Sequence, residues 1–389
     1  MTQQYNNPAN AQPSTAGTQL QDFYYARKAL TEIAHEQFFT PLASTTDMPM
    51  HYGKRIVRYV YVPLLDDRNV NDEGLDAQGA TSVNGNLYGS SRDVGKIVGK
   101  MPVLSETGGR TNRVGYTRKT IEGTFQNYGI FSDYTEDSVN FDTDSELMTH
   151  INREMLIGAN QVTEDLLQVD LISNAGVNIF AGAATTTATI NKDAVVDYAT
   201  LVNLATTLDN NRTPKDTKIN TGSTMVDTKT LPAARILYAG PSMKNTFRKM
   251  VDFFGNPAFI PTHQYASGQT PLKGEIGQID EFRIVINPQM MAWEGTGAAG
   301  TNADGVHTAG GKVNVYPLLV VGSESFTTIG FQSDAKSVKF KIIHKKPGIE
   351  TASDRDPYGK KGFMSVQWWY GFMVLRAERL AVIKTAAKL

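Results

Sequence analysis

The sequence predicts an α+β fold, because its candidate strands do not alternate regularly with its candidate helices. Segments rich in Val, Ile, Tyr and Thr occupy residues 54–65 and 114–131, and one long amphipathic helix is expected from residue 144 to 173. Several more strands follow residue 235, with only short helices among them. A doubly wound sheet would interleave strands and helices, so the pattern favours the α+β class.

The composition sets limits on the class of protein. With 389 residues the chain is long enough for two or three structural units, and its 40% hydrophobic and 20% charged residues are typical of a folded protein. The formal charge of -1 argues against binding nucleic acid or anionic lipid over the whole surface. The sequence has no Cys, which excludes disulfides, thiolate metal ligands and a Cys nucleophile. We see neither a membrane-spanning segment nor a secretory signal, so we expect no export.

The first segment is expected to be a mobile arm. Residues 1–21 carry no charged side chain and are mostly Gln, Asn, Ala, Ser, Thr and Pro, a composition that buries little apolar surface. A helix is expected next, ending before Pro41. Its apolar face would consist of Phe23, Ala26, Leu30 and Ile33.

The strands at 54–65 and 114–131 can form the two arms of one hairpin. Between them, residues 66–113 contain 8 Gly in 48 positions and show little apolar periodicity. So long a loop inside a compact domain is unusual. We therefore expect it to project outward and to find its partners on another molecule.

Charge is unevenly distributed along this loop. Its first part is acidic, with Asp66, Asp67, Asp72, Glu73 and Asp76 against Arg68, and its last part is basic, with Arg92, Lys96, Lys100, Arg110 and Arg113 against Asp93 and Glu106. The two halves can pair with each other, or each can pair with a neighbouring molecule. For the second interpretation the candidate contact residues are Asp72, Glu73, Arg92, Lys96, Lys100, Arg110 and Arg113.

The long helix begins with a capping box, Thr143 to Glu146. Apolar residues then recur every three or four positions, which predicts about 30 residues, roughly 45 Å, of helix. The expected inward residues are Met148, Ile151, Met155, Ala159, Val162, Leu166 and Val169. A second helix is expected over 193–209, with Val196, Ala199 and Leu204 inward, followed by a polar linker to Thr230.

The second half mixes strands with short helices. A strand is expected at 235–240, with Pro241 starting a helix. Further strands are expected at 282–287, 313–322, 337–344 and 362–375, and a Gly-rich loop at 294–311.

The motifs that carry chemistry are weak. Residues 89–96 (GSSRDVGK) differ from a phosphate-binding loop, because five residues separate the glycines and Ile97 replaces the Mg²⁺-binding Ser or Thr. His35-Glu36 lacks the second His that a zinc site on a helix needs. The acids Asp142, Asp144 and Glu146 suit a helix N-terminus and lack the Gly of a calcium-binding loop.

Other candidate groups have structural explanations. The six His are dispersed and no Ser lies in a G-x-S-x-G elbow. Residues 354–356 (DRD) precede Pro357 and Gly359, which favours a turn. Trp293, Trp368 and Trp369 can stack on a ligand, but strand aromatics are more often core. We therefore expect no catalytic, metal-binding or cofactor-binding residues.

Several motifs resemble the major capsid proteins of tailed bacteriophages of the N4-type branch. They are residues 274–277 (GEIG) before the strand FRIVINP, and residues 356–369 (DPYGKKGFMSVQWW) leading into LRAERLAVIKTA. The order of arm, strand, long loop, returning strand and capped helix agrees over nearly the whole chain. The resemblance implies an HK97-like capsid fold and a structural protein that assembles into an icosahedral shell.

The resemblance also implies a domain division. Residues 1–50 would form an N-terminal arm and 51–125 an extended β-hairpin loop, the E-loop, that covers a neighbour. Residues 126–185 with 331–389 would form the peripheral domain around the spine helix, and 186–330 the axial domain.

The expected partners follow from the same resemblance. The chain would assemble with itself as pentamers and hexamers, with a separate scaffolding protein, a portal and an optional decoration protein. It would enclose double-stranded DNA without sequence-specific binding and without a membrane, in a virion assembled in the host cytoplasm. The alternatives are an enzyme with an unrecognised site and a surface-displayed ligand-binding protein.

Overall fold

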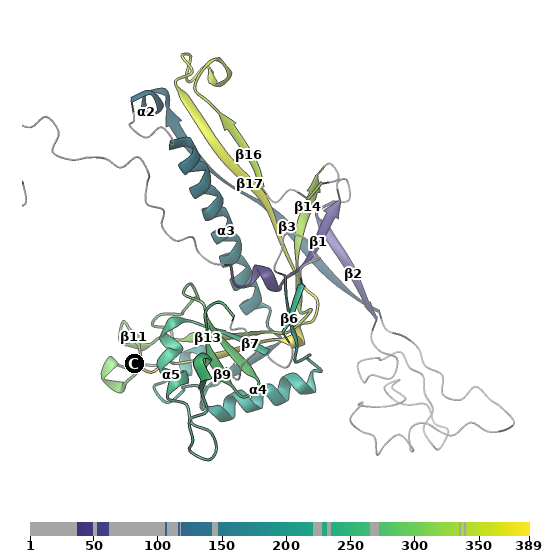
Figure 1. Cartoon of the computed structure of the whole chain (residues 1–389), viewed down its shortest axis with the longest axis vertical. Coiled ribbons are helices and arrows are strands. Elements are labelled where there is room, and N and C mark those ends of the chain that lie inside the picture. Colours follow the sequence, from purple (N-terminus) through teal and green to yellow (C-terminus); the bar gives the residue numbers. More distant parts are fainter. Residues whose placement is uncertain are drawn as a thin grey trace, which may run out of the picture. The chain divides into compact units, whose positions relative to one another are not determined.

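The computed structural model describes residues 37–49, 53–61, 106, 116, 118–141, 147–220, 228–231, 235–264, 272–333, 336–337 and 340–389 (Figure 1). Residues 1–36, expected to hold the arm and the first helix, lie outside this range, as does the loop 66–113 apart from Glu106. The chain forms two compact units. Within the described range, one comprises Ser132–Ile157 and His344–Met364, and the other Gln37–Phe131, Gly158–Ile343 and Ser365–Leu389.

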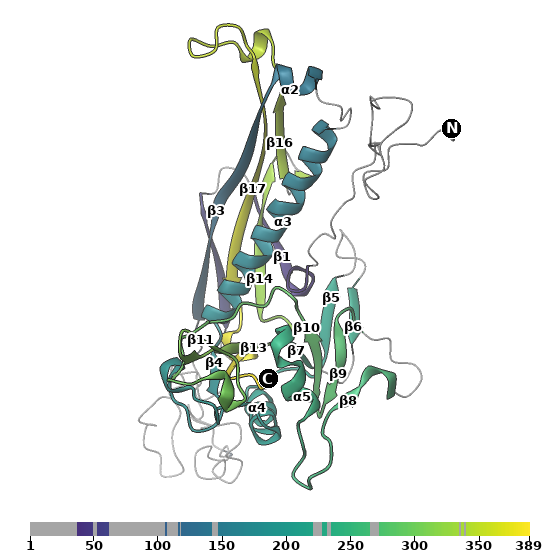
Figure 2. The same ribbon diagram turned by 90° about the vertical axis from the view of Figure 1, so that its left-hand side faces the viewer.

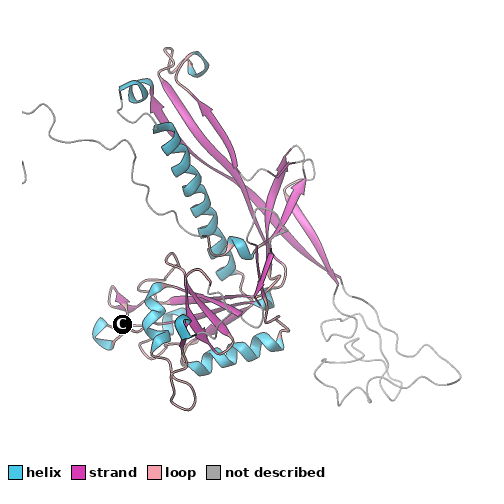
Figure 3. Cartoon of the chain, viewed as in Figure 1, coloured by secondary structure: helices cyan, strands magenta, loops and turns pink. Residues whose placement is uncertain are grey.

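The first sheet has the strand order β1-β14-β17-β3-β2, with β15 paired to β14 and β16 to β17. Its strands other than β15 are labelled in Figure 1 and drawn in magenta, like all strands, in Figure 3. Its strands are β1 (Ser44–Pro49), β2 (Arg55–Tyr61), β3 (Arg118–Thr135), β14 (Phe326–Ser333), β15 (Lys336–Ser337), β16 (Phe340–Lys345) and β17 (Lys361–Val374). β2 and β3 are antiparallel, from Arg55 opposite Thr124 to Tyr61 opposite Arg118. This pairing confirms the predicted hairpin arms.

The second sheet has the order β4-β18-β13-β7-β10-β9-β8 (Figure 2). Its strands are β4 (Val177–Phe180), β7 (Arg235–Ala239), β8 (Ile260–Pro261), β9 (Glu275–Ile279), β10 (Phe282–Ile286), β13 (Tyr316–Val321) and β18 (Leu380–Thr385). Every residue of β7, β10 and β13 is buried, so both faces of these central strands are covered.

Two helices supply part of the core on this sheet, α4 (Tyr198–Asn210) and α5 (Lys244–Arg248). α4 begins later than the predicted residue 193, because Asp197 caps it by accepting a hydrogen bond from the Thr200 N–H at 2.8 Å. Leu204 of α4 and Phe247 of α5 belong to one buried cluster with alternate residues of the sheet, including Leu237 and Ile284. Tyr238 lies on the opposite face of β7 from Leu237, and its ring packs edge-to-face on that of Phe39, with the ring centres 4.9 Å apart.

The remaining elements are short. They are α2 (Glu136–Phe141), β5 (Thr217–Asn220), β6 (Thr228–Leu231), β11 (Thr308–Ala309), β12 (Lys312–Val313) and the 3-10 helices η2 (Thr40–Leu42), η4 (Thr187–Thr189), η5 (Pro241–Met243), η6 (Thr262–Gln264), η7 (Asn302–Asp304), η8 (Ile349–Thr351) and η9 (Ala377–Arg379). β5 and β6 pair where a polar linker was predicted, because Thr-rich segments suit an antiparallel ribbon.

The predicted long helix is present as α3 (Leu147–Ser173), but its inward face differs from the prediction. The predicted capping box extends over residues outside the described range. Met155 and Ala159 are buried as expected, whereas Val162 and Val169 are 40% and 48% exposed. The buried residues of the second half are Glu164, Leu167, Gln168, Leu171 and Ile172. Polar Glu164 and Gln168 are buried because they bind backbone groups of other segments.

Several strands were missed, among them β1, β4, β14 and β18. β1 lies parallel to β14 and is held partly by hydroxyl contacts, such as Thr46 with Thr327 at 3.0 Å, which leave no apolar alternation. β4 and β18 pair with each other in the second sheet, although both fall in the ranges expected for the peripheral domain. β18 is almost completely buried because its segment, LAVIKT, carries apolar residues on both faces.

The unit formed by Ser132–Ile157 and His344–Met364 has its own polar contacts. The Tyr134 hydroxyl lies 2.6 Å from Nε2 of His344, and burial raises the pKa of Tyr134. The Glu136 N–H donates to the Lys360 carbonyl at 2.9 Å, and the Gly348 N–H to the Gly359 carbonyl at 2.8 Å. These bonds close the end of the β16–β17 hairpin.

Candidate assembly surfaces

The sequence-predicted contact residues of the loop all lie outside the described residues. This holds for Asp72, Glu73, Arg92, Lys96, Lys100, Arg110 and Arg113. The structure does describe the two strands that carry the loop, β2 and the start of β3, which run side by side (Figure 1). We call residues 55–61 paired with 118–124 the ribbon.

One face of the ribbon is held by its own chain at Ile56, whereas Arg58 and Val60 on the same side of β2 are exposed. Ile56 and Ile121 pack against buried Ile329 of β14 and Met373 of β17. Gly123 lies opposite Ile56, and a Cβ atom there would come within 2.7 Å of Cδ1 of Ile329. The inward face is therefore packed so closely against β14 and β17 that no Cβ atom fits at Gly123.

The outward face is exposed although it is apolar and aromatic. Val57, Tyr59 and Tyr61 alternate along β2 and are 43%, 58% and 62% exposed. The Arg118 guanidinium lies 4.5 Å from the centre of the Tyr59 ring, and Arg55 forms an ion pair with Glu122. Tyr and Arg are the residues enriched at the centres of protein interfaces, so this face has the chemistry of a docking surface.

Sequence reasoning found the strand and missed this face. The segment RIVRYVY places apolar side chains at both odd and even positions, and only one of these sets can face the chain's own sheet. Apolar residues on both faces of a projecting strand are the sequence signal that could have predicted an exposed apolar face in need of a partner.

The segment before β1 is bound to α3 through Glu164. Oε1 of this buried carboxylate accepts hydrogen bonds from the N–H groups of Phe38 at 2.7 Å and Phe39 at 2.5 Å. Oε2 accepts from the Thr40 N–H at 3.2 Å and the Thr40 hydroxyl at 2.5 Å. Glu164 thus supplies acceptors to a turn that begins η2. Burial raises the pKa of nearby Tyr238, and the charge of Glu164 raises it further. No local pattern signals this contact, because the partners are 125 residues apart.

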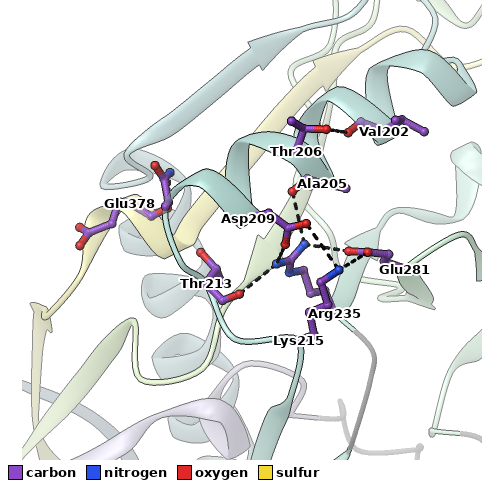
Figure 4. A network of polar contacts seen from close by, with 10 residues as sticks. Val202, Ala205, Thr206, Asp209, Thr213, Lys215, Arg235, Glu281 and Glu378 are labelled. Atoms are coloured by element: carbon purple, nitrogen blue, oxygen red, sulfur yellow. Dashed lines mark hydrogen bonds and ion pairs between the residues drawn. The ribbon is translucent and has the colours of Figure 1, made fainter. Parts of the chain in front are cut away.

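A second polar network surrounds Arg235 and is structural (Figure 4). The guanidinium is 1% exposed and donates to Asp209 at 2.5 Å, Glu281 at 3.0 Å and the Thr213 carbonyl at 2.9 Å. Lys215 pairs with both carboxylates. The hydrogen bond from Arg235 lowers the pKa of Asp209. The network joins α4 to β7 and to the residue before β10, so its charges are engaged within the fold.

Of the other groups considered from the sequence, residues 89–96, His35-Glu36 and the acids at 142, 144 and 146 lie outside the described residues. Among the described ones, packing and turns account for the following side chains. Trp368 is buried, and Lys384 lies between Trp293 at 5.2 Å and Phe180 at 5.4 Å. Asp356 accepts a hydrogen bond from the Lys361 N–H at 2.9 Å, as in a turn. The residues described contain no group of three or more His, Cys, Asp or Glu able to hold a metal ion. None of the described helices is long and apolar enough to span a bilayer.

Comparison with known proteins gives a consistent result. A family model described as phage capsid protein matches residues 118–385. The chain is 55% identical over 386 residues to the major capsid protein of Pseudomonas phage KPP21, covering 99% of this chain and 97% of that protein.

Solved structures agree at the level of the fold. The capsid of Ralstonia phage GP4 superimposes with a TM-score of 0.54 at 10% identity, covering 96% of this chain and 97% of that chain. The capsid asymmetric unit of cyanophage Pam1 gives a TM-score of 0.52 at 11% identity, covering 97% of this chain and 98% of that chain.

Proposed function

Because this chain belongs to the phage capsid protein family and forms the head shell of a phage, we propose that the outward face of the ribbon binds a neighbouring copy. The chain has an HK97-like α+β fold and a structural role. The predicted fold class and family are confirmed, while the N4-type branch stays a prediction.

The exposed stripe of Val57, Tyr59 and Tyr61 carries this proposal. Fully burying a large apolar side chain gains about 1.5–3 kcal/mol, and these side chains are 43–62% exposed, so a partner that covers them gains roughly half of that for each. In a shell the neighbours of each subunit are mainly copies of itself, so a copy is the partner that is always present. The ribbon also needs no rearrangement, since β3 and the inward contacts of Ile56 and Ile121 already hold it.

We extend the proposal to the loop that the ribbon carries. Its acidic first half and basic last half can pair with opposite charges on the neighbour, through Asp72, Glu73, Arg92, Lys96, Lys100, Arg110 and Arg113. Changing Arg110 and Arg113 to Glu should then block assembly while the melting temperature of the subunit is kept. Raised salt should weaken wild-type assembly. Normal assembly of the double variant at low salt would show that the loop halves pair within one chain.

The domain division remains part of the proposal. We assign residues 1–50 to an arm, 51–125 to the E-loop, 126–185 with 331–389 to a peripheral domain and 186–330 to an axial domain. The pairing of β4 and β18 supports moving these two strands to the axial domain. Copies would then form pentamers and hexamers, through an axial domain built on the second sheet.

Further partners are proposed from the family alone. They are a scaffolding protein, a portal, an optional decoration protein and enclosed double-stranded DNA bound without sequence specificity, with assembly in the host cytoplasm. The formal charge of -1 supports weak contact with DNA. Within the described part of the chain, no observation favours the alternatives of an enzyme or a ligand-binding protein.

The experiment compares two double variants of the chain, each combined with the proposed scaffolding protein, by light scattering and negative-stain electron microscopy. Tyr59→Ser with Tyr61→Ser removes the stripe, whereas Tyr59→Phe with Tyr61→Phe keeps both rings. Both side chains are more than half exposed, so neither variant should unfold the subunit. The Ser variant loses the contact of the Tyr59 ring with Arg118, at about 0.5–1 kcal/mol, and the Phe variant keeps a ring there. We expect the Ser variant to stay unassembled and the Phe variant to form shells.

The opposite result is equally clear. If the Ser variant forms shells at the same concentration as the wild type, the outward face of the ribbon is not a contact between subunits.

A further inference from the structure

The outward side of α5 is a second surface that the fold leaves without a partner. The buried residues of this helix face the second sheet, whereas Lys244, Arg248 and Lys249 are exposed. The segment that follows β18 lies beside α5, since the Lys388 N–H donates to Oγ1 of Thr246 at 3.1 Å, and Lys388 is exposed as well. We call Lys244, Arg248, Lys249 and Lys388 the cationic patch.

The described part of the chain supplies no counter-charge to this patch. None of its four side chains forms a salt bridge with a residue that the structure describes. Lys244 and Arg248 are one helical turn apart, a spacing at which like charges destabilise a helix. Asp252, the nearest acid along the chain, already accepts hydrogen bonds from the N–H groups of Phe254 and Asn256, each at 2.8 Å. An anion from outside the chain would therefore offset a repulsion that the fold leaves in place.

The neighbouring helix adds no free negative charge. α4 and α5 cover the same face of the second sheet, because buried residues of both belong to one cluster with the same side of its strands. The exposed side chains of α4 include Asn203 and Thr206, which are neutral. Its one acid, Asp209, is bound by Arg235 at 2.5 Å. This face thus presents local positive charge, although the chain as a whole has a formal charge of -1.

We propose that the cationic patch contacts the phosphate groups of the DNA inside the shell. The proposal rests on the proposed function, which supplies the enclosed DNA as a partner. Double-stranded DNA carries one phosphate charge for about every 1.7 Å of its axis, so a duplex lying on this face brings a phosphate within reach of each cation. An acidic protein would instead need carboxylates placed to match four long side chains. Contacts of Lys and Arg with phosphate carry no sequence information, as non-specific enclosure requires.

Chemical acetylation of lysines tests the proposal on DNA-filled heads and DNA-free shells of the wild-type chain. We expect Lys244, Lys249 and Lys388 to react about fivefold or more slowly in the filled heads, because phosphate contacts shield their ammonium groups. Lys215 is the control and should react equally in both particles, since it pairs with two carboxylates of its own chain. At about 1 M salt the screening length falls to roughly 3 Å, so the difference should shrink.

Two variants of Arg248 test whether the patch acts through its charge. In filled heads of Arg248→Gln, Lys244 and Lys249 should be acetylated faster than in the wild type, because one phosphate contact is lost. Arg248→Lys keeps the charge and should protect both lysines as the wild type does. The melting temperature should not change in either variant, since the side chain is exposed.

Two results would overturn the proposal. Fast acetylation of the cationic patch in both particles would mean that DNA does not reach it. Slow acetylation in both particles would mean that protein, not DNA, covers it. Either result leaves the shell function intact, whereas failure of the wild-type chain to form any shell would contradict the proposed assembly.

Discussion

The ribbon and the central strands of the second sheet have similar sequences and opposite burial. β2 reads RIVRYVY and is exposed at six of its seven positions, while β10 reads FRIVI and is buried throughout. β7, RILYA, is also buried throughout, including its arginine. A strand sequence with apolar residues on both faces thus indicates that both faces are covered. It does not indicate which chain covers them. In the second sheet the cover is the chain's own helices and strands, and in the ribbon we propose that it is another copy.

Replacing Arg235 by Ala should have the largest effect on the subunit. The change leaves Asp209 and Glu281 without their main cation and opens space beside β7, so we expect a loss of about 3 kcal/mol in the free energy of unfolding. Lys215→Ala is the control, because it removes an exposed cation from the same network and should be close to wild type. Urea denaturation of both variants measures the difference. Equal midpoints would mean that the buried guanidinium adds no stability.

Glu164→Ala should rank second. The N–H groups of Phe38 and Phe39 lose their acceptor in a buried environment, which costs about 2 kcal/mol. Hydrogen exchange at residues 38–40 should accelerate more than in the rest of the chain. Glu154→Ala, an exposed position on the same helix, should leave these amides protected. Unchanged exchange at 38–40 would show that Glu164 does not hold this segment.

Gly123→Ala separates the two faces of the ribbon. Its Cβ would lie 2.9 Å from Cβ of Met373, so overpacking should cost about 1–3 kcal/mol. Thr120→Ala, on the outward face, should change stability by less than about 0.5 kcal/mol. Thermal unfolding of unassembled subunits provides the comparison. Similar melting temperatures for both variants would mean that the inward face is not anchored as the structure has it.

The smallest effect concerns pH. Arg235 holds the pKa of Asp209 below its ordinary value of 3.8, so this carboxylate stabilises the folded state above that pH. The contribution is lost as the pH falls through the lower folded pKa. In Asp209→Asn, stability should therefore fall less than in the wild type between about pH 4 and pH 2. Parallel acid titrations of urea midpoints measure this, and identical slopes would remove Asp209 from the acid response.

Much of the fold could be predicted, namely those helices and strands whose sequences show a clear pattern of apolar residues. The β2–β3 pair, the helix from residue 147 and β7, β10, β13 and β17 all carry strong periodicity or apolar runs. β1 was missed because hydroxyl contacts with β14 replace an apolar face. The inward face of α3 was wrong beyond Ala159, because Glu164 and Gln168 are buried by backbone partners that no local sequence pattern reveals.

The candidate assembly surface was likewise predicted only in part. The projecting hairpin followed from the long loop between two strands, but the outward stripe at Tyr59 and Tyr61 required the register with β3 to show which side chains stay exposed.

Hydroxyl-radical footprinting of Tyr59 and Tyr61 tests the central claim most directly. In unassembled subunits both rings should be modified rapidly, since they are 58% and 62% exposed, while buried Trp368 serves as the unreactive reference. In shells we expect the modification rates of Tyr59 and Tyr61 to fall toward that of Trp368. Equal rates for the two tyrosines before and after assembly would contradict the claim that a neighbouring copy covers the ribbon.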